Sequence, residues 1–562
     1  MNITENEPNQ KYITQLKDVE DNLIDLLPTQ LNLQAFPKPQ PTPFFMSMDG
    51  IPIQEQITWI IPAIQVPGLA EKPETKSIGV GGGSYSLHLR NVLKSSGIYA
   101  LSSVATPLVA LVLAPFLTRN LSHTDYGSLA VINTAIALLA GITQLGLWTA
   151  FLRSYTYDYE SRIDRLGVVS TVVVLLLLAS VPTTLVIMLI APWIGSLLLS
   201  SPHYSNYIGM AALVVLLQNL AVPGLAWMRA ENRAVLFALI STVNLLINLI
   251  TTIILVGVLH MGVVGSLIGT GCGYGFVVAC TLPFIVLRAG VRVRADIAYG
   301  LLTFGLPNVS SYISLWMLQL ADRFLLAHLR SLSETAIYTV AYSLGGVMSV
   351  LVLSPFSMAW TAAQFIVAKR DDAKDIFQLV FRWFSIVLFF AAYALSLVGV
   401  FVLNAFFPQS YHVASSIIPI ITLSTLFYGV YNFLTLGISI RKKTWLSIVF
   451  TAVAALVNIG LNIFFIPLYG SMGAAIATLL AYMLLALLTY IVNQRIYPVP
   501  FEIGIFSIAL CIGTALYLGS TFLAQAQTTS VAWGIHISAL CLYGCGLALL
   551  GKLWGRSPKN KY

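Results

Sequence analysis

The chain has 562 residues, of which 57% are hydrophobic and only 9% are charged. Soluble globular chains are about 25% charged, so a soluble enzyme of this composition is excluded. The 30 Lys and Arg residues exceed the 22 Asp and Glu residues, an excess that is typical of proteins that bind nucleic acid or anionic lipid.

The segment before the first long apolar run is rich in acidic residues and proline. Ten Asp and Glu residues occur by position 74, and Gly81–Gly83 end the segment. This composition predicts a largely disordered cytosolic extension over residues 1–88, without an N-terminal targeting signal. Two interpretations stay open, a solvated tail and a docking peptide for a partner enzyme.

Fourteen apolar runs follow from residue 97 onward, each close to the 20 or so residues that span a bilayer. They lie at 98–118, 127–150, 167–191, 207–228, 234–257, 262–287, 299–322, 335–360, 379–403, 413–437, 444–467, 472–494, 502–524 and 529–550. Backbone polar groups in lipid must be satisfied internally, which predicts helices. We therefore expect an all-α polytopic membrane protein with about 14 transmembrane helices.

The basic residues provide an independent test of this topology. If the N-terminus is cytoplasmic, 27 of the 30 Lys and Arg residues fall on the cytoplasmic side, and only Arg119, Arg323 and Arg330 fall on the other. This is the asymmetry that the positive-inside rule describes. The topology explains the basic excess without nucleic acid and predicts that both termini are cytoplasmic.

Short segments recur at an offset near 210 residues, which indicates an internal duplication. The matches are Val243–Asn248 with Val457–Asn462 at an offset of 214, Gly262–Gly265 with Gly470–Gly473 at 208, and, more weakly, Thr118–Tyr126 with the stretch that ends at Tyr338 at 212.

An offset of this length spans six helices, an even number, so the two repeats are parallel. We predict an N-lobe over residues 89–295 (helices 1–6) and a C-lobe over residues 296–497 (helices 7–12). Residues 498–562 add helices 13 and 14 and a basic tail. Two lobes around an axis along the membrane normal suit alternating access.

Catalytic motifs are missing from the sequence. It has no G-x-x-x-x-G-K-[ST], H-E-x-x-H or G-x-S-x-G pattern, the patterns that mark phosphate loops, zinc hydrolases and serine hydrolases. We expect no enzyme activity, no cofactor and no metal.

Helix 7 carries a polar stripe whose members recur at spacings of three, four or seven residues: Asn308, Ser311, Tyr312, Gln319 and Asp322. Lipid penalises such a face, so it should meet a neighbouring helix or a wet cavity. Two readings stay open. One is interhelical hydrogen bonding with a snorkelling Asp322–Arg323 pair at the membrane edge. The other is a central cavity for polar cargo, with Asp322 holding a coupling proton or cation.

Helix 1 carries a similar stripe, formed by Ser95, Tyr99, Ser102 and Thr106. Arg119 and Arg153 end helices 1 and 2. Each arginine either snorkels to an interface or presents its planar donor fork to an anionic cargo such as a diphosphate.

Five motifs in order resemble those of bacterial polysaccharide flippases. They are Leu117–Gly127 ("LTR-x-L-x-x-x-[DE]-Y-G"), Gln144–Arg153 ("LG-x-x-x-A-x-x-R"), the run Gly305–Pro307, Ala321–Leu326 and Ile337–Tyr342 ("GLP … DRF-x-L … Y-x-x-A-Y"), Pro355–Trp360, and Ile466–Ala475. Over residues 90–495 the chain is thus identified as a member of the polysaccharide-transport branch of the multidrug/oligosaccharidyl-lipid/polysaccharide exporter superfamily. The long N-terminal extension departs from that family.

The resemblance implies a flippase of the bacterial cytoplasmic membrane that moves polyprenyl-diphosphate-linked oligosaccharides outward for exopolysaccharide or lipopolysaccharide assembly, commonly coupled to an ion gradient. Helices 1, 2, 7 and 8 line the cavity of such proteins. We therefore predict substrate contacts and an ion-coupling role for Asp322; the substrate contacts are Tyr99, Ser102, Arg119, Arg153, Asn308, Tyr312, Gln319 and Arg323.

The expected partners are the lipid-linked oligosaccharide, membrane lipid, and components of the polysaccharide polymerase or glycosyltransferase machinery. The alternatives are a cation-coupled multidrug antiporter and a lipid II flippase of the same superfamily. A polytopic glycosyltransferase or polymerase is disfavoured, because the connections between the predicted helices are shorter than about 20 residues,.

Overall fold

The computed structural model describes residues 105, 109–199, 204–525 and 527–554. Helices make up this part of the chain, and η marks short π-helical or 3-10 segments. The first half contains Val109–Asn120, α4 (His123–Thr143), α5 (Leu147–Arg153), η2 (Ser154–Asp158), α6 (Arg162–Leu189), α7 (Ala191–Leu199), α8 (Ser205–Ala230), α9 (Ala234–Thr252), η4 (Ile253–Val258) and α10 (Gly262–Ala289).

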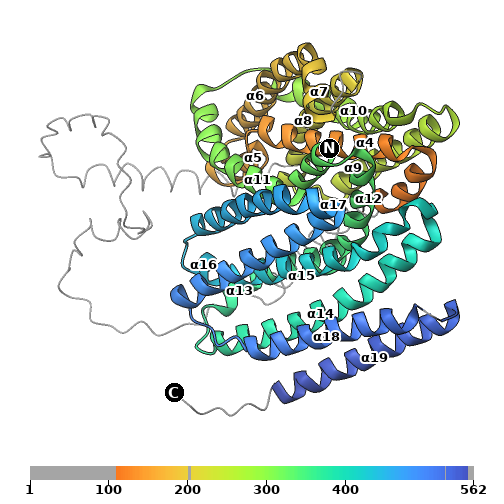
Figure 1. The fold of residues 1–562 in the computed structure, drawn as a ribbon. Coiled ribbons are helices and arrows are strands. Elements are labelled where there is room, and N and C mark those ends of the chain that lie inside the picture. Colours follow the sequence, from red (N-terminus) through yellow and green to blue (C-terminus); the bar gives the residue numbers. More distant parts are fainter. Residues whose placement is uncertain (1–104, 106–108, 200–203, 526, 555–562) are drawn as a thin grey trace, which may run out of the picture. The chain divides into compact units, whose positions relative to one another are not determined.

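The second half contains α11 (Ala295–Leu329), α12 (Leu332–Gly345), η5 (Ser349–Leu353), α13 (Ser354–Val367), α14 (Ala373–Phe406), η6 (Gln409–Ser416), α15 (Ile418–Leu434), α16 (Leu436–Ile440), α17 (Trp445–Ile496), α18 (Ile503–Ala524) and α19 (Thr529–Trp554). In Figure 1, α14, α18 and α19 lie side by side, and α18 and α19 pack on each other and on α14.

Twelve helical segments in the described residues are long and apolar enough to cross a membrane. The longest, Trp445–Ile496, contains the non-helical residue Gly470 (φ 57°, ψ −133°) and is two helices joined at a kink. It accounts for the predicted runs 444–467 and 472–494. Val109–Asn120 covers the second half of the run 98–118, and most of the first half lies outside the described residues. The prediction of an all-α polytopic membrane protein is confirmed.

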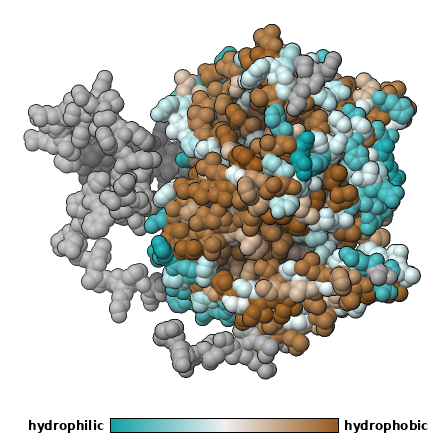
Figure 2. Space-filling view, viewed as in Figure 1, coloured by the Kyte–Doolittle hydropathy of each residue, from teal (hydrophilic) through white to brown (hydrophobic). Residues whose placement is uncertain are grey.

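The surface of the spans is suited to hydrocarbon. Large apolar side chains such as Leu189, Leu287 and Phe522 are exposed. Figure 2 shows apolar side chains across the middle of one face, with hydrophilic side chains towards its left and right margins. Apolar patches of this extent mark a surface that contacts lipid or another protein.

Backbone geometry confirms the parallel repeat. Asn232 and Lys442, 210 positions apart, both adopt positive φ angles (55° and 57°), at the turns that follow α8 and α16. Equivalent backbone hydrogen bonds close the two turns. The backbone N of Arg233 donates to the carbonyl of Met228 at 2.8 Å, and that of Lys443 donates to the carbonyl of Ile438 at 2.9 Å. Gly262 and Gly470, 208 positions apart, share φ angles of 59° and 57°.

These turns correct the register of one sequence match. The offset is 210 at the turn before α9 and 208 at the glycine that begins α10. With the offset of 210, Asn248 aligns with Asn458, and Thr252 aligns with Asn462. Both pairs make an i, i+4 side-chain hydrogen bond, 3.1 Å from Thr252 Oγ1 to Asn248 Oδ1 and 3.0 Å from Asn462 Nδ2 to Asn458 Oδ1. The offset of 214 is therefore wrong by one helical turn, an error that the i, i+4 spacing of asparagines invites.

The helix caps correct the weaker match. Ser122 caps α4 by accepting a hydrogen bond from the backbone N of Asp125 at 3.0 Å. Ser331 caps α12 by accepting one from the backbone N of Glu334 at 3.1 Å. These equivalent caps lie 209 positions apart, so the offset of 212 is out of register by three residues.

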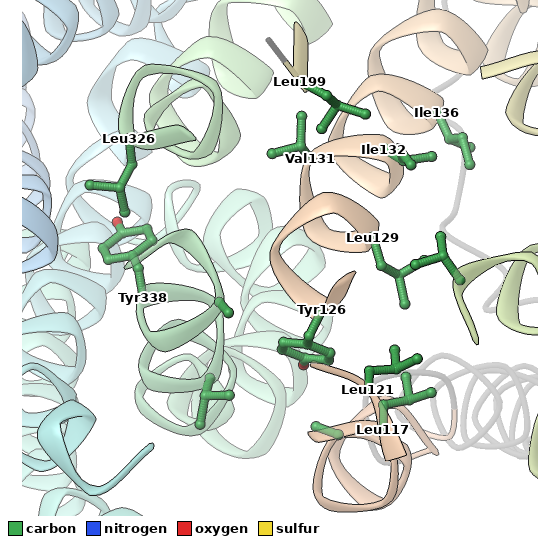
Figure 3. Close-up of a cluster of buried hydrophobic side chains, with 14 of the residues drawn as sticks. Leu117, Leu121, Tyr126, Leu129, Val131, Ile132, Ile136, Leu199, Leu326 and Tyr338 are labelled. Atoms are coloured by element: carbon green, nitrogen blue, oxygen red, sulfur yellow. The ribbon is translucent and has the colours of Figure 1, made fainter. Parts of the chain in front are cut away.

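The two halves meet where α4 packs against α11 and α12, and where α5 packs against α11. A cluster of buried apolar side chains runs through this junction, including Tyr126 and Ile132 of α4, Leu326 of α11 and Tyr338 of α12 (Figure 3). The lobe boundaries at residues 295 and 497 stay predictions.

The connector between α10 and α11 is held to α6. The hydroxyl of Ser170 donates to the carbonyl of Gly290 at 3.0 Å and accepts from the backbone N of Arg292 at 2.7 Å. Arg294 forms an ion pair with Asp164. Hydrogen bonds to Asp296 and Asp164 raise the pKa of the Arg294 guanidinium,. The start of α11 is therefore anchored to the first half.

Candidate functional site

The polar stripe of α11 faces the first half of the chain. The hydroxyl of Tyr312 donates to the carbonyl of Ala137 at 2.7 Å, and the indole Nε1 of Trp316 donates to the carbonyl of Thr134 at 3.1 Å. Both acceptors lie on α4. The stripe therefore does meet a neighbouring helix, as the first of the two readings expects for this part of it.

Nearer its start, α11 presents accessible polar groups opposite α5. The exposed amide of Asn308 lies 3.3 Å from the hydroxyl of Thr149, which is also exposed. The Arg153 side chain is 49% exposed, lies 3.6 Å from Asp158, and places its guanidinium 4.6 Å from the centre of the Phe304 ring. Polar groups in a span are costly in lipid, so this face needs water or a polar ligand.

Two turns before its end, α11 carries a buried charged group. Asp322 is 1% exposed and Arg323 is 6% exposed, and their side chains approach to 3.2 Å. The hydroxyl of Tyr338 donates to the second oxygen of Asp322. Arg323 also donates to the carbonyl of Gln319 at 3.1 Å, and its guanidinium lies 4.4 Å from the centre of the Tyr342 ring.

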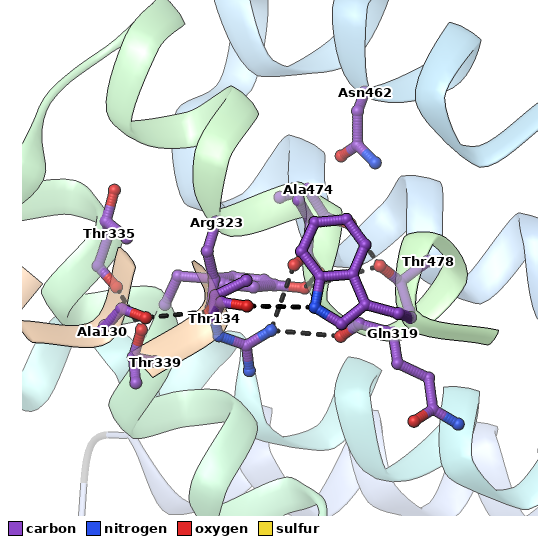
Figure 4. A network of polar contacts seen from close by, with 12 residues as sticks. Ala130, Thr134, Gln319, Arg323, Thr335, Thr339, Asn462, Ala474 and Thr478 are labelled. Atoms are coloured by element: carbon purple, nitrogen blue, oxygen red, sulfur yellow. Dashed lines mark hydrogen bonds and ion pairs between the residues drawn. The ribbon is translucent and has the colours of Figure 1, made fainter. Parts of the chain in front are cut away.

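Figure 4 shows this network between α4, α11, α12 and α17: the Arg323 guanidinium reaches the backbone carbonyl of Gln319, whose side-chain amide points away from it. Thr478 of α17 lies 3.4 Å from the Tyr338 hydroxyl. The Asp322–Arg323 pair is enclosed by protein, so it is not a snorkelling pair at the membrane edge. Its charges are compensated inside the protein, as buried charges must be.

The same end of the helices is held closed by contacts between the two halves. Thr124 at the start of α4 lies 3.5 Å from Ser333 at the start of α12, measured between their hydroxyl oxygens. His123 Nε2 lies 2.8 Å from the hydroxyl of Ser410 in η6, and the His123 ring stacks on Tyr411 with centroids 4.1 Å apart.

The structure does not bring all the predicted site residues together. Tyr99 and Ser102 lie outside the described residues. Arg119 is exposed at the end of Val109–Asn120, next to the start of α4, whereas Arg153 ends α5. The 21 residues of α4 span about 30 Å,. One diphosphate therefore cannot contact both arginines in this arrangement.

The remaining predicted residues form two groups along α11. Arg153, Asn308 and Tyr312 lie on the accessible stretch, while Gln319, Asp322 and Arg323 lie in or beside the buried network. The sequence reasoning missed the roles of three neighbours, Thr149, Trp316 and Tyr338. Trp316 follows Tyr312 by four residues, so helical spacing could have placed it beside the stripe.

Solved structures share this arrangement of helices, although no curated protein matches the sequence. Among them, the lipid II flippase MurJ in an inward closed conformation matches with a TM-score of 0.61 and 16% identity, covering 80% of this chain and 97% of that chain.

Two multidrug transporter structures also match. An inward-facing MATE family transporter of the MOP superfamily has a TM-score of 0.54 and 15% identity, covering 70% of this chain and 97% of that one. A mutant of the Vibrio cholerae MATE transporter VcmN has a TM-score of 0.50 and 16% identity, covering 74% of this chain and 98% of that one. At these identities the likeness establishes the fold.

The sequence profile of one family extends over the helices that build the junction. The profile described as "Polysaccharide biosynthesis protein" matches residues 116–415, more than half of the 562 residues. The match runs from the end of Val109–Asn120 into η6 and includes Arg153, Asn308 and the Asp322–Arg323 pair. Together with the fold it confirms the family that the sequence motifs predicted, and the chain belongs to the polysaccharide biosynthesis protein family, with the fold of the flippases and exporters of the MOP superfamily.

Proposed function

We propose that this protein is a flippase that moves polyprenyl-diphosphate-linked oligosaccharides across the bacterial cytoplasmic membrane for surface polysaccharide assembly. The proposal rests on the family of the chain and on one observation, the difference in exposure between the two ends of α11. An accessible polar stretch opposite α5 is followed by a sealed, charged network where α4 meets α12.

The chemistry of the cargo explains why such a path is needed. A diphosphate and a hydrophilic glycan cannot enter hydrocarbon without partners, because burying unpaired charge costs many kcal/mol. Asn308, Thr149 and Arg153 offer amide, hydroxyl and guanidinium groups that replace part of the lost water. The polyprenyl tail stays in lipid while the head group passes between the halves.

The direction of loading follows from the positive-inside rule. Arg153, Arg162 and Arg165 cluster at the accessible end, which we assign to the cytoplasm. The closed end, at His123 and Ser333, then faces outward, and both termini are cytoplasmic. This arrangement suits the capture of cargo from the inner leaflet, where lipid-linked oligosaccharides of this kind are made.

Asp322 offers a coupling step. Protonation of its carboxyl would leave the buried guanidinium of Arg323 without its counter-charge, which costs several kcal/mol. That cost favours a rearrangement that rehydrates Arg323 and opens the closed end. A membrane potential adds roughly 2.3 kcal/mol for each charge moved through 100 mV.

Asp322→Asn tests this step in proteoliposomes that hold a fluorescent polyprenyl-diphosphate oligosaccharide. We expect slower flipping that no longer responds to an imposed pH gradient. The unpaired Arg323 should lower the unfolding temperature, but the protein should still insert and stay monodisperse under the assay conditions. The matched control is Asp371→Asn, which changes an exposed carboxylate in the turn before α14. Gradient-dependent flipping by Asp322→Asn at the normal rate would remove the coupling role.

Complementation separates this function from its alternatives. Strains that lack a polysaccharide flippase, a lipid II flippase or a multidrug exporter would each receive the gene. We expect restored surface glycan in the first strain alone. Rescue of lipid II transport or of drug resistance without glycan would replace the proposed substrate.

A further inference from the structure

A separate cavity of about 400 Å³ opens at the start of α6, bordered by η2, α8 and α10. Its volume falls within the range of small-molecule sites. Three arginines line it, Arg162 and Arg165 of α6 and Arg288 of α10. They do not belong to the α5–α11 face described above, and the proposed transport path does not use them.

The floor of the cavity consists of aromatic side chains whose polar atoms are hydrogen-bonded within the protein. Tyr155 and Trp227 are 6% and 8% exposed, and the Trp227 indole donates to the Tyr155 hydroxyl at 3.2 Å. That hydroxyl donates in turn to Glu231. Glu231 and Glu160 also line the cavity. Because the Tyr155 hydroxyl occupies Glu231, the groups left to meet a ligand are the three arginines and the exposed carboxylate of Glu160, which leaves the positive charges in excess.

The three arginines keep donors available. Arg165 is oriented by a 3.0 Å bond from its Nε to the carbonyl of Tyr159 and by the Tyr155 ring, 5.5 Å from its guanidinium carbon. That hydrogen bond uses only Nε, so both terminal nitrogens of Arg165 can still donate to a ligand. The ion pairs among the described residues do not include Arg162, Arg165 or Arg288. The three side chains line one cavity, and guanidinium groups match the geometry of phosphate oxygens.

The helix ends that carry Arg162 and Arg288 also expose apolar side chains. Ile163, next to Arg162, is 80% exposed, and Leu287, next to Arg288, is 86% exposed. The guanidinium of Arg288 sits 4.7 Å from the centre of the Phe284 ring. Long cationic side chains beside exposed apolar ones are typical of the boundary between hydrocarbon and head groups.

From these observations we propose that the cavity binds a phosphate ester, carried by the head group of an anionic membrane lipid or by a soluble phosphate compound. The phosphate oxygens accept from Arg162, Arg165 and Arg288. Binding joins α6 to α10 at the end next to the connector between the two halves.

The test uses the full chain, purified in detergent and stripped of lipid, with binding read by native mass spectrometry and by the shift in unfolding temperature. The probes are dioctanoyl phosphatidylglycerol, glycerol phosphate and dioctanoylglycerol, which lacks the phosphate. We expect saturable binding of a phosphate-bearing probe and none of dioctanoylglycerol. Preference for the phosphatidylglycerol identifies a lipid as the source, and equal binding of glycerol phosphate identifies a soluble compound.

The variants Arg162→Gln and Arg288→Gln should each weaken binding about tenfold, the equivalent of one charge-assisted hydrogen bond. Both side chains are exposed, so the unliganded variants should unfold at the wild-type temperature. The matched control is Arg292→Gln, an exposed arginine at the same end that does not line the cavity. Unchanged affinity in Arg162→Gln and Arg288→Gln, an equal loss in Arg292→Gln, or binding of dioctanoylglycerol would overturn the proposal.

Discussion

Asp322 and Arg323 are neighbours in sequence, and adjacent residues on a helix do not normally face each other. Their side chains nevertheless meet at 3.2 Å, because both turn into the space that Tyr338 and the Gln319 carbonyl complete. Buried ion pairs contribute little net stability, since desolvation offsets their attraction. Substituting only one partner is destabilising, because the other charge is then buried without a counter-charge.

Arg323→Leu should therefore destabilise the protein strongly. Loss of one partner of a buried pair costs about 3–5 kcal/mol, and the cost here falls on the unpaired Asp322 carboxylate. The double variant Asp322→Asn with Arg323→Leu should recover part of that loss. Thermal unfolding in detergent measures both.

The control for this series is Arg330→Leu. Arg330 pairs with Glu334 at 3.6 Å, but its side chain is 38% exposed, and exposed pairs are worth about 1 kcal/mol or less. If Arg330→Leu lowered the unfolding temperature as much as Arg323→Leu, the buried pair would have no special weight.

At the scale of elements, α4 and α12 approach each other at backbone distance. A Cβ atom built on Gly127 would lie 1.8 Å from the carbonyl oxygen of Leu332. Any side chain at Gly127 must push the starts of the two helices apart. Small residues allow this kind of close helix contact in membranes, and here the contact joins the two halves of the molecule.

Gly127→Ala should loosen the closed end. Closure can be read by a disulfide between Thr124→Cys and Ser333→Cys, whose native hydroxyl oxygens lie 3.5 Å apart. The background lacks the five native cysteines, Cys272, Cys280, Cys511, Cys541 and Cys545. We expect efficient cross-linking with Gly127 present and several-fold slower cross-linking with alanine.

A matched glycine serves as the reference. Gly209 of α8 has open space around a built Cβ atom, so Gly209→Ala should leave the cross-linking rate unchanged. Equal rates for Gly127→Ala and the parent protein would show that the two helix starts are not held at this distance.

At the scale of the whole molecule, two repeated halves share one junction that is closed at one end and accessible at the other. Alternating access requires that the closed end opens during each cycle. The contacts of His123 and Thr124 with η6 and α12 must then break. Packed junctions of this kind switch between discrete arrangements rather than deform continuously.

Oxidation of the pair Thr124→Cys and Ser333→Cys should therefore stop flipping, and reduction should restore it. The single variant Thr124→Cys under the same oxidant controls for chemical damage. Flipping at full rate by completely cross-linked protein would mean that this end stays shut throughout transport.

Apolar runs and basic residues were enough to predict the helices, because hydrocarbon imposes length and charge placement directly on the sequence. The register of the repeat was harder to predict from the sequence. Because Asn244 and Asn248 are four residues apart, they fit the offsets of 214 and 210 equally well. The site was least predictable. His123 contacts Ser410, which lies 287 positions away in the sequence. Tyr312 donates to a backbone carbonyl, and any residue type can supply such an acceptor, so the sequence gives no sign of this bond.

The anchored start of α11 has a mechanical consequence. Arg294 ties that start to Asp164 on α6, while the far part of α11 packs along α17 in the other half. If one half rotates against the other, α11 cannot follow both and has to flex along its length. Pro307 lies in the helix between the two attachments, and proline lacks the amide that would bond the preceding turn. The stretch around Pro307, next to Asn308, is thus the place where α11 can bend most easily, and motion there would reshape the surface that we propose the cargo touches.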